Sequence, residues 1–141
     1  MSIVHPWLPG ARVIDLFAGS GALGLEALSR GAISCDFVES AAKSLAALQA
    51  NIAKLDASGR SRVHRSDALR FASGLAPNSF DVAFADPPYE KGLARALAEL
   101  WLEVPFAGVL GVEHAAREAL PPSGETRRYG TTAITFYGLR R

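Results

Sequence analysis

The sequence DLFAGSGALG, residues 15–24, joins a strand to a helix through a glycine-rich turn. The run that leads into it, ARVIDLF at 11–17, is apolar and β-branched, which is typical of a buried strand. After Gly21, leucine and alanine recur at helical spacing as far as Gly31, a residue that commonly ends helices. The stretch therefore predicts one strand–turn–helix unit.

The same alternation continues along the chain. Further strands are expected at 33–39, 62–66, 80–85 and 107–114, and helices at 41–56, 67–73 and 91–103. The last two segments, ETRRYG and TAITFYGLR, have the pattern of a hairpin. This order predicts an α/β fold: a mostly parallel sheet with right-handed crossovers and helices on both faces, closed by an antiparallel hairpin.

The length and charge of the chain limit the number of domains and the way it can bind nucleic acid. A chain of 141 residues, 49% hydrophobic, has the size of a single domain with one core. The 15 basic and 14 acidic residues give a net charge of +1, so no long-range field draws nucleic acid to the whole molecule. Any basic surface must be local. Two groups of arginines are candidate phosphate contacts: Arg60, Arg62, Arg65 and Arg70, and Arg127, Arg128, Arg140 and Arg141.

The remaining special residues point to a cytoplasmic protein without a metal, and a monomer is expected. Cys35 lies in an apolar run, which favours a buried free thiol in a reducing compartment. No segment has the pattern of a signal peptide or of a membrane span. The three histidines lack the spacing of zinc ligands, and both tryptophans are expected to pack in the fold.

The glycine loop predicts a nucleotide-like ligand without saying which one. Gly19, Gly21 and Gly24 spell G-x-G-x-x-G, and a helix N-terminus after such a turn favours an anionic group. Glu39 ends the second strand, where a carboxylate accepts hydrogen bonds from a ribose diol. Asp15 distinguishes the ligands better, because a carboxylate at the strand end suits the cationic S-adenosylmethionine more than a pyrophosphate. A tight turn without any ligand stays open at this point.

The second motif is FADPPYE, residues 84–90, at the end of the fourth predicted strand. Pro87 and Pro88 restrict the backbone, so that Asp86 and the carbonyl of Pro87 are held as acceptors in a fixed direction. A planar exocyclic amine has two N–H donors for them, and Tyr89 can stack on its base. The motif predicts methyl transfer to such an amine.

The two motifs together resemble the class I S-adenosylmethionine-dependent amino-methyltransferases, which have a seven-stranded sheet with a reversed last strand. The segments VIDLFAGSGALGLEALSRGA (13–32), DPPY (86–89) and RYGTTAITFY (128–137) look more narrowly like the RsmD-like family. Members of that family methylate the N2 amine of a guanine in 16S ribosomal RNA. The resemblance runs over nearly the whole chain.

The resemblance implies a role for each site residue. It assigns the methionine end of the cofactor to Asp15, Gly19 and Gly21, with Phe17 also in the cofactor site. It assigns the ribose to Glu39, the adenine to Asp67 and Ala68, and the target base to Asp86, Pro87, Pro88 and Tyr89. Ribosomal RNA or a small-subunit particle is the implied partner.

Two departures from the family and three alternatives accompany this reading. Family members usually start earlier, with a basic segment and a helix, so residues 1–141 are expected to be a catalytic domain without that extension. Ala41 stands where the family often has an acidic or amide residue.

The alternatives are an amino-methyltransferase acting on DNA adenine or cytosine or on protein glutamine, a cofactor-binding subunit without catalysis, and, least favoured, an NAD-dependent dehydrogenase.

Overall fold

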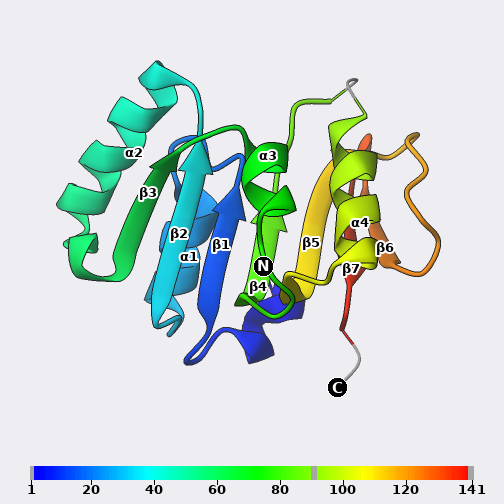
Figure 1. Cartoon of the computed structure of the whole chain (residues 1–141), viewed down its shortest axis with the longest axis horizontal. Coiled ribbons are helices and arrows are strands. Elements are labelled where there is room, and N and C mark those ends of the chain that lie inside the picture. Colours follow the sequence, from blue (N-terminus) through cyan, green and yellow to red (C-terminus); the bar gives the residue numbers. More distant parts are fainter. Residues whose placement is uncertain (1, 90–91, 140–141) are drawn as a thin grey trace.

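The computed structural model describes residues 2–89 and 92–139, which form one seven-stranded sheet with helices on both faces (Figure 1). The strands lie in the order β3-β2-β1-β4-β5-β7-β6. Their bounds are β1 Arg12–Leu16, β2 Ser34–Glu39, β3 Ser61–Arg65, β4 Phe80–Ala85, β5 Ala107–Ala115, β6 Glu125–Tyr129 and β7 Thr132–Tyr137. The helices are α1 Ala22–Ser29, α2 Ala42–Lys54, α3 Ala68–Ser73 and α4 Leu93–Glu103, with short 3₁₀ helices η1 Ser2–Trp7 and η2 Ser58–Arg60.

The first strand of the chain, β1, lies inside the parallel part of the sheet. The chain enters at β1, adds β2 and β3 on one side, then crosses to place β4 and β5 on the other. The direction of winding therefore reverses between β1 and β4. In open α/β sheets, ligands bind outside the carboxyl ends of the strands at such a point.

Two layers of helices cover the sheet, as the strand–helix alternation predicts. The core on one face joins residues of η1, α1 and α2 to alternate residues of the strands, and it includes the buried thiol of Cys35. The core on the other face gathers α3 and α4. Trp7 packs against the first core and Trp101 against the second, so the expectation that both tryptophans pack is confirmed.

The C-terminal hairpin is confirmed, and its second strand takes the inner position. β7 lies between β5 and β6 and pairs antiparallel with both. The reason is burial, because β7 carries the apolar side chains Ala133, Phe136 and Tyr137, whereas β6 is mostly exposed. Arg140 and Arg141, named above as candidate phosphate contacts, lie outside the described residues.

Among the helices described, none is both long and apolar enough to cross a membrane.

Candidate active site

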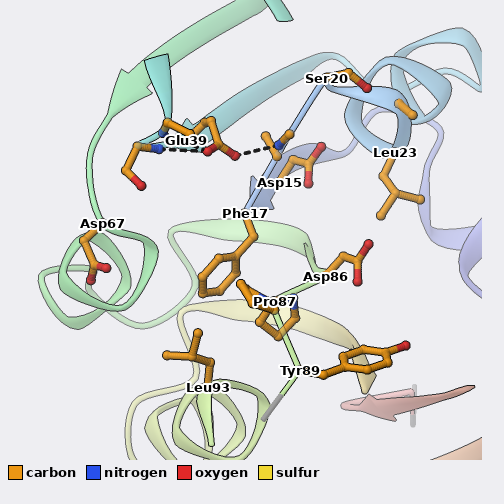
Figure 2. Close-up of a pocket in the computed structure, with 16 residues that line it drawn as sticks. Asp15, Phe17, Ser20, Leu23, Glu39, Asp67, Asp86, Pro87, Tyr89 and Leu93 are labelled. Carbon is orange, nitrogen blue, oxygen red and sulfur yellow. Dashed lines mark hydrogen bonds between the residues drawn. The ribbon is translucent and has the colours of Figure 1, made fainter. Parts of the chain in front are cut away.

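A cleft of about 880 Å³ opens beyond the carboxyl ends of β1, β2 and β4, where the winding reverses (Figure 2). It brings together residues from two motifs that are some seventy positions apart in the chain. The predicted site residues that line it are Asp15, Phe17, Gly19, Glu39, Asp67, Asp86, Pro87, Pro88 and Tyr89. Two predicted residues, Gly21 and Ala68, are buried beside the cleft and do not line it.

The glycine loop is tied to the end of β2 by a carboxylate. The backbone N–H of Gly19 donates to Oε1 of Glu39 over 2.7 Å, at a φ of +58° that glycine adopts easily. Oε2 of Glu39 accepts from the backbone N–H groups of Ser40 at 3.2 Å and Ala41 at 3.0 Å. Figure 2 shows these bonds across the top of the cleft. Glu39 therefore holds the loop in its bent form before any ligand is considered.

The other two glycines of the motif serve packing. A Cβ on Gly21 would come within 2.4 Å of Leu48, and one on Gly24 within 2.4 Å of the Phe37 ring and 2.7 Å of the Cys35 sulfur. The missing side chains let α1 and α2 approach each other, and let α1 lie directly on β2. This explains why Gly21 does not reach the cleft.

Asp15 is buried at the end of β1, with 1% of its surface exposed. Its Oδ2 accepts the backbone N–H of Gly24 at 3.0 Å, which links the strand to the first turn of α1. Burial raises the pKa of Asp15 to about 8, against the lowering effect of that hydrogen bond, and nearby Asp86 and Glu39 raise it further. The group is therefore mostly protonated at neutral pH, and a cation in the cleft would favour its ionised form.

The turn after β4 presents its acceptor to the cleft. Asp86 is exposed at the cleft, and within the described parts of the chain no donor is recorded for its carboxylate. Desolvation by burial nevertheless raises the pKa of Asp86 above its usual value. Pro87 is buried and anchors the turn, while the Pro88 and Tyr89 that follow are exposed. Figure 2 shows Asp86 and Tyr89 on the side of the cleft opposite Glu39.

Two residues that the sequence did not suggest hold Tyr89. Its hydroxyl donates to Oε2 of Glu113 on β5 over 3.4 Å and lies 3.2 Å from the hydroxyl of Thr132 on β7. Burial raises the pKa of Glu113, and Asp86 raises it further, while the bond from Tyr89 lowers it. Only the order of the strands brings these residues together, since they are 24 and 43 positions from Tyr89.

The charge of the cleft is acidic. Among the described residues that line it, four are carboxylic acids, Asp15, Glu39, Asp67 and Asp86, and none is basic. A pyrophosphate would meet these acids without a cation to balance it, whereas a cationic ligand is favoured. The side chain of Asp67 accepts the N–H of Arg70 at 2.9 Å and caps α3.

The first arginine group does not form one surface. Arg60 donates to the carbonyls of Leu28 and Ala32, and it lines a separate hollow with Arg62 near the starts of the strands. Arg65 ends β3, at the same edge of the sheet as the cleft. In the second group, Arg127 pairs with Glu125.

No group of three potential metal ligands occurs in residues 2–89 and 92–139.

The reversed β7, the parallel core and the acidic cleft at the switch point define a methyltransferase of the Rossmann-like class. The chain belongs to the family described as "Conserved hypothetical protein 95", whose model matches residues 1–138. The expected RsmD-like membership is confirmed by the relatives that follow.

Three similar proteins illustrate the relationship. The chain is 35% identical over 150 residues to "Putative rRNA methyltransferase YlbH" of Bacillus subtilis, covering 99% of this chain and 82% of that one. It is 41% identical over 95 residues to "Ribosomal RNA small subunit methyltransferase D" of Escherichia coli, covering 67% of this chain and 47% of that one. The solved structure "Putative methyltransferase yhhF from Escherichia coli" superposes with a TM-score of 0.81 at 30% identity, covering 96% and 79%. In the second case, the aligned part spans about half of the relative.

Proposed function

We propose that the chain is the catalytic domain of an S-adenosylmethionine-dependent enzyme that methylates the N2 amine of a guanine in small-subunit ribosomal RNA. The observation that carries this proposal is the Asp86 carboxylate, which lies at the cleft opposite the glycine loop with no recorded donor among the described residues. The printed names of the relatives, an rRNA methyltransferase and a ribosomal RNA small subunit methyltransferase, support the substrate class.

The residues of the cleft suit S-adenosylmethionine. When bound, it supplies a methyl group on a positively charged sulfur. Asp86 offers negative charge to the sulfonium and ammonium groups, and so does Asp15 once the cation has displaced its proton. The described lining of the cleft holds no cation that would oppose them. The half-buried Glu39 suits a ribose hydroxyl, because its Oε1 accepts the N–H of Gly19 and can accept one further hydrogen bond. Asp67 and Phe17 lie on the adenine side in this assignment.

The chain's own contribution to the reaction is alignment and proton acceptance. Asp86 and the Pro87 carbonyl would accept the two N–H bonds of the amine, which directs the nitrogen lone pair toward the methyl group. The bound donor would supply the methyl group to the aligned nitrogen, and Asp86 or water would take the proton that the amine loses. Tyr89, which is 38% exposed, would stack on a base unstacked from the RNA.

The proposal is tested by transfer of labelled methyl groups. The protein is incubated with labelled S-adenosylmethionine and small ribosomal subunits from cells that lack the corresponding activity, and the RNA is digested to nucleosides. We expect the label in N2-methylguanosine at one position. Label in a methylated adenosine or cytidine would contradict the substrate. Cofactor binding without any transfer would favour a binding subunit.

A second arm tests the boundary of the domain. The same assay compares this chain with a version to which the basic N-terminal segment of a family member is fused. We expect a lower KM for the extended protein and a similar rate at saturation, because a basic segment adds phosphate contacts without changing the cleft. A change in the saturated rate alone would contradict this division of roles.

A further inference from the structure

Glu113 lies beside Asp86 because of the register of two strands. Phe84 pairs with Gly111 and Ala85 with Val112 in the parallel ladder of β4 and β5. Asp86 and Glu113 each follow this last pair of the ladder, so both lie at the carboxyl end of the two neighbouring strands. Glu113 follows Val112 of the second core along β5, so its side chain points to the α1 face of the sheet, and Asp86 lines the cleft together with Leu23 of α1.

A small hollow of about 50 Å³ extends the cleft toward Glu113. It is lined by residues of α1, β4, β5 and β7: Leu23, Phe84, Ala85, Gly111, Glu113, Ile134 and Phe136. Leu23 lines both this hollow and the main cleft, which shows that the two are neighbours. The Glu113 carboxylate thus lies beside the main cleft, in a hollow that shares Leu23 with it.

The Glu113 carboxylate is short of donors. The Tyr89 hydroxyl is the donor recorded for it in the described part of the chain, at the long distance of 3.4 Å. Asp86 has no recorded donor there. Two adjacent acceptors without close donors complement a ligand edge that carries two adjacent N–H groups.

Among nucleobases, guanine has such an edge, with N1–H next to the N2 amine. Adenine and cytosine have an acceptor nitrogen beside their amine, and the lone pair of that nitrogen would repel a carboxylate. We infer that Glu113 accepts the N1–H of the target guanine while Asp86 accepts its N2 amine, and that Glu113 is thereby the residue that selects guanine over other amine-bearing bases. This inference rests on the proposed function and adds to it a residue and a basis for specificity.

The experiment uses the target position identified by the methyl-transfer assay. Small-subunit RNA is assembled by ligation with either guanine or 2-aminopurine at that position and reconstituted into particles. 2-Aminopurine keeps the 2-amine but has an acceptor at N1. We expect the wild-type protein to prefer guanine about 100-fold in kcat/KM. Glu113→Gln should reduce that preference to about tenfold or less, because an amide can accept from N1–H or donate to a bare N1.

Thr132→Val is the matched control, because it removes the other partner of the Tyr89 hydroxyl and leaves the carboxylate in place. Its preference for guanine should stay at the wild-type value. Equal loss on both substrates in Glu113→Gln, or no preference in the wild type, would overturn the inference while leaving the proposed function intact. Transfer to neither substrate by the wild type would instead refute the proposed function.

Discussion

The glycine loop between β1 and α1 and the Asp86–Tyr89 turn after β4 border the same cleft but are held differently. Carboxylates at two strand ends hold the loop, since the N–H of Gly19 donates to Glu39 on β2 and the N–H of Gly24 donates to Asp15 on β1. The carboxylate of the turn bonds to no described residue, and proline geometry with a buried Pro87 keeps it in place. The hydrogen-bonding groups that hold the loop are already paired, whereas the Asp86 carboxylate of the turn remains available to a ligand. Changes in the loop should therefore affect stability and cofactor affinity, and changes in the turn should affect turnover.

Asp86→Ala tests the turn most directly. We expect kcat to fall at least about 100-fold, because a preorganised acceptor for the reacting amine is lost, with the dissociation constant for S-adenosylmethionine changed less than about threefold. Asp86→Asn should keep part of the rate, since its amide oxygen still accepts an N–H bond. Rapid-quench transfer and calorimetric titration measure the two quantities. A variant that binds cofactor poorly but still turns over would place Asp86 with the loop instead.

Asp15→Asn tests the loop through pH. The pKa of Asp15 is about 8 in the folded protein and near 3.8 when unfolded, so the folded state binds the extra proton between these values. Its contribution to stability is complete below about pH 4 and is lost as the pH rises through 8. Asp15→Asn keeps an acceptor for Gly24 and removes this loss. The variant should have a higher free energy of unfolding than the wild type at pH 8.5, and the difference should shrink steadily toward pH 4.

Urea unfolding at a series of pH values measures this difference. Asp56→Asn, an exposed change away from the cleft, is the control and should show a nearly constant difference from the wild type over the same range. A constant gap for Asp15→Asn as well would contradict the raised pKa.

Gly24→Ala tests the packing of the loop against β2. The new Cβ would meet the Phe37 ring and the Cys35 sulfur at less than 3 Å, so we expect a loss of about 1 to 3 kcal/mol in unfolding free energy. Gly59→Ala is the matched control, because nothing lies within 4 Å of its Cβ, and it should be neutral or slightly stabilising. Chemical denaturation compares the two. Equal effects would show that close packing at Gly24 is unimportant.

Glu39→Gln should have the mildest effect. The amide keeps one acceptor oxygen but loses the charge that strengthens the bonds from Gly19 and Ala41, so stability should fall by about 1 kcal/mol. Affinity for S-adenosylmethionine should fall about tenfold, with the saturated rate kept. Glu26→Gln, in an exposed pair with Arg30, is the control and should leave both unchanged. A drop in the saturated rate with normal affinity for S-adenosylmethionine would contradict the separate roles of the loop and the turn.

Local patterns predicted the elements and most of the cleft, because strand ends in a parallel sheet meet at one edge. The Asp86 turn and Glu39 were found in this way. Contacts set by tertiary packing could not be predicted in this way. A side chain at Gly21 would collide with α2, and one at Gly24 would collide with β2. Glu113 was missed because the pairing of β5 with β4 was not predicted, and Thr132 was missed because the hairpin was predicted without knowing that β7 would lie next to β5. An apolar β7 beside a polar β6 was the signal that could have revealed it.

The proton on Asp15 has a consequence for how the protein meets its methyl donor. A cation that settles beside a carboxyl group with a pKa near 8 displaces that proton into solvent at neutral pH. Heat released on complex formation would then vary with the ionisation enthalpy of the buffer, and the occupied and empty enzymes would differ in net charge by less than the charge of the ligand itself.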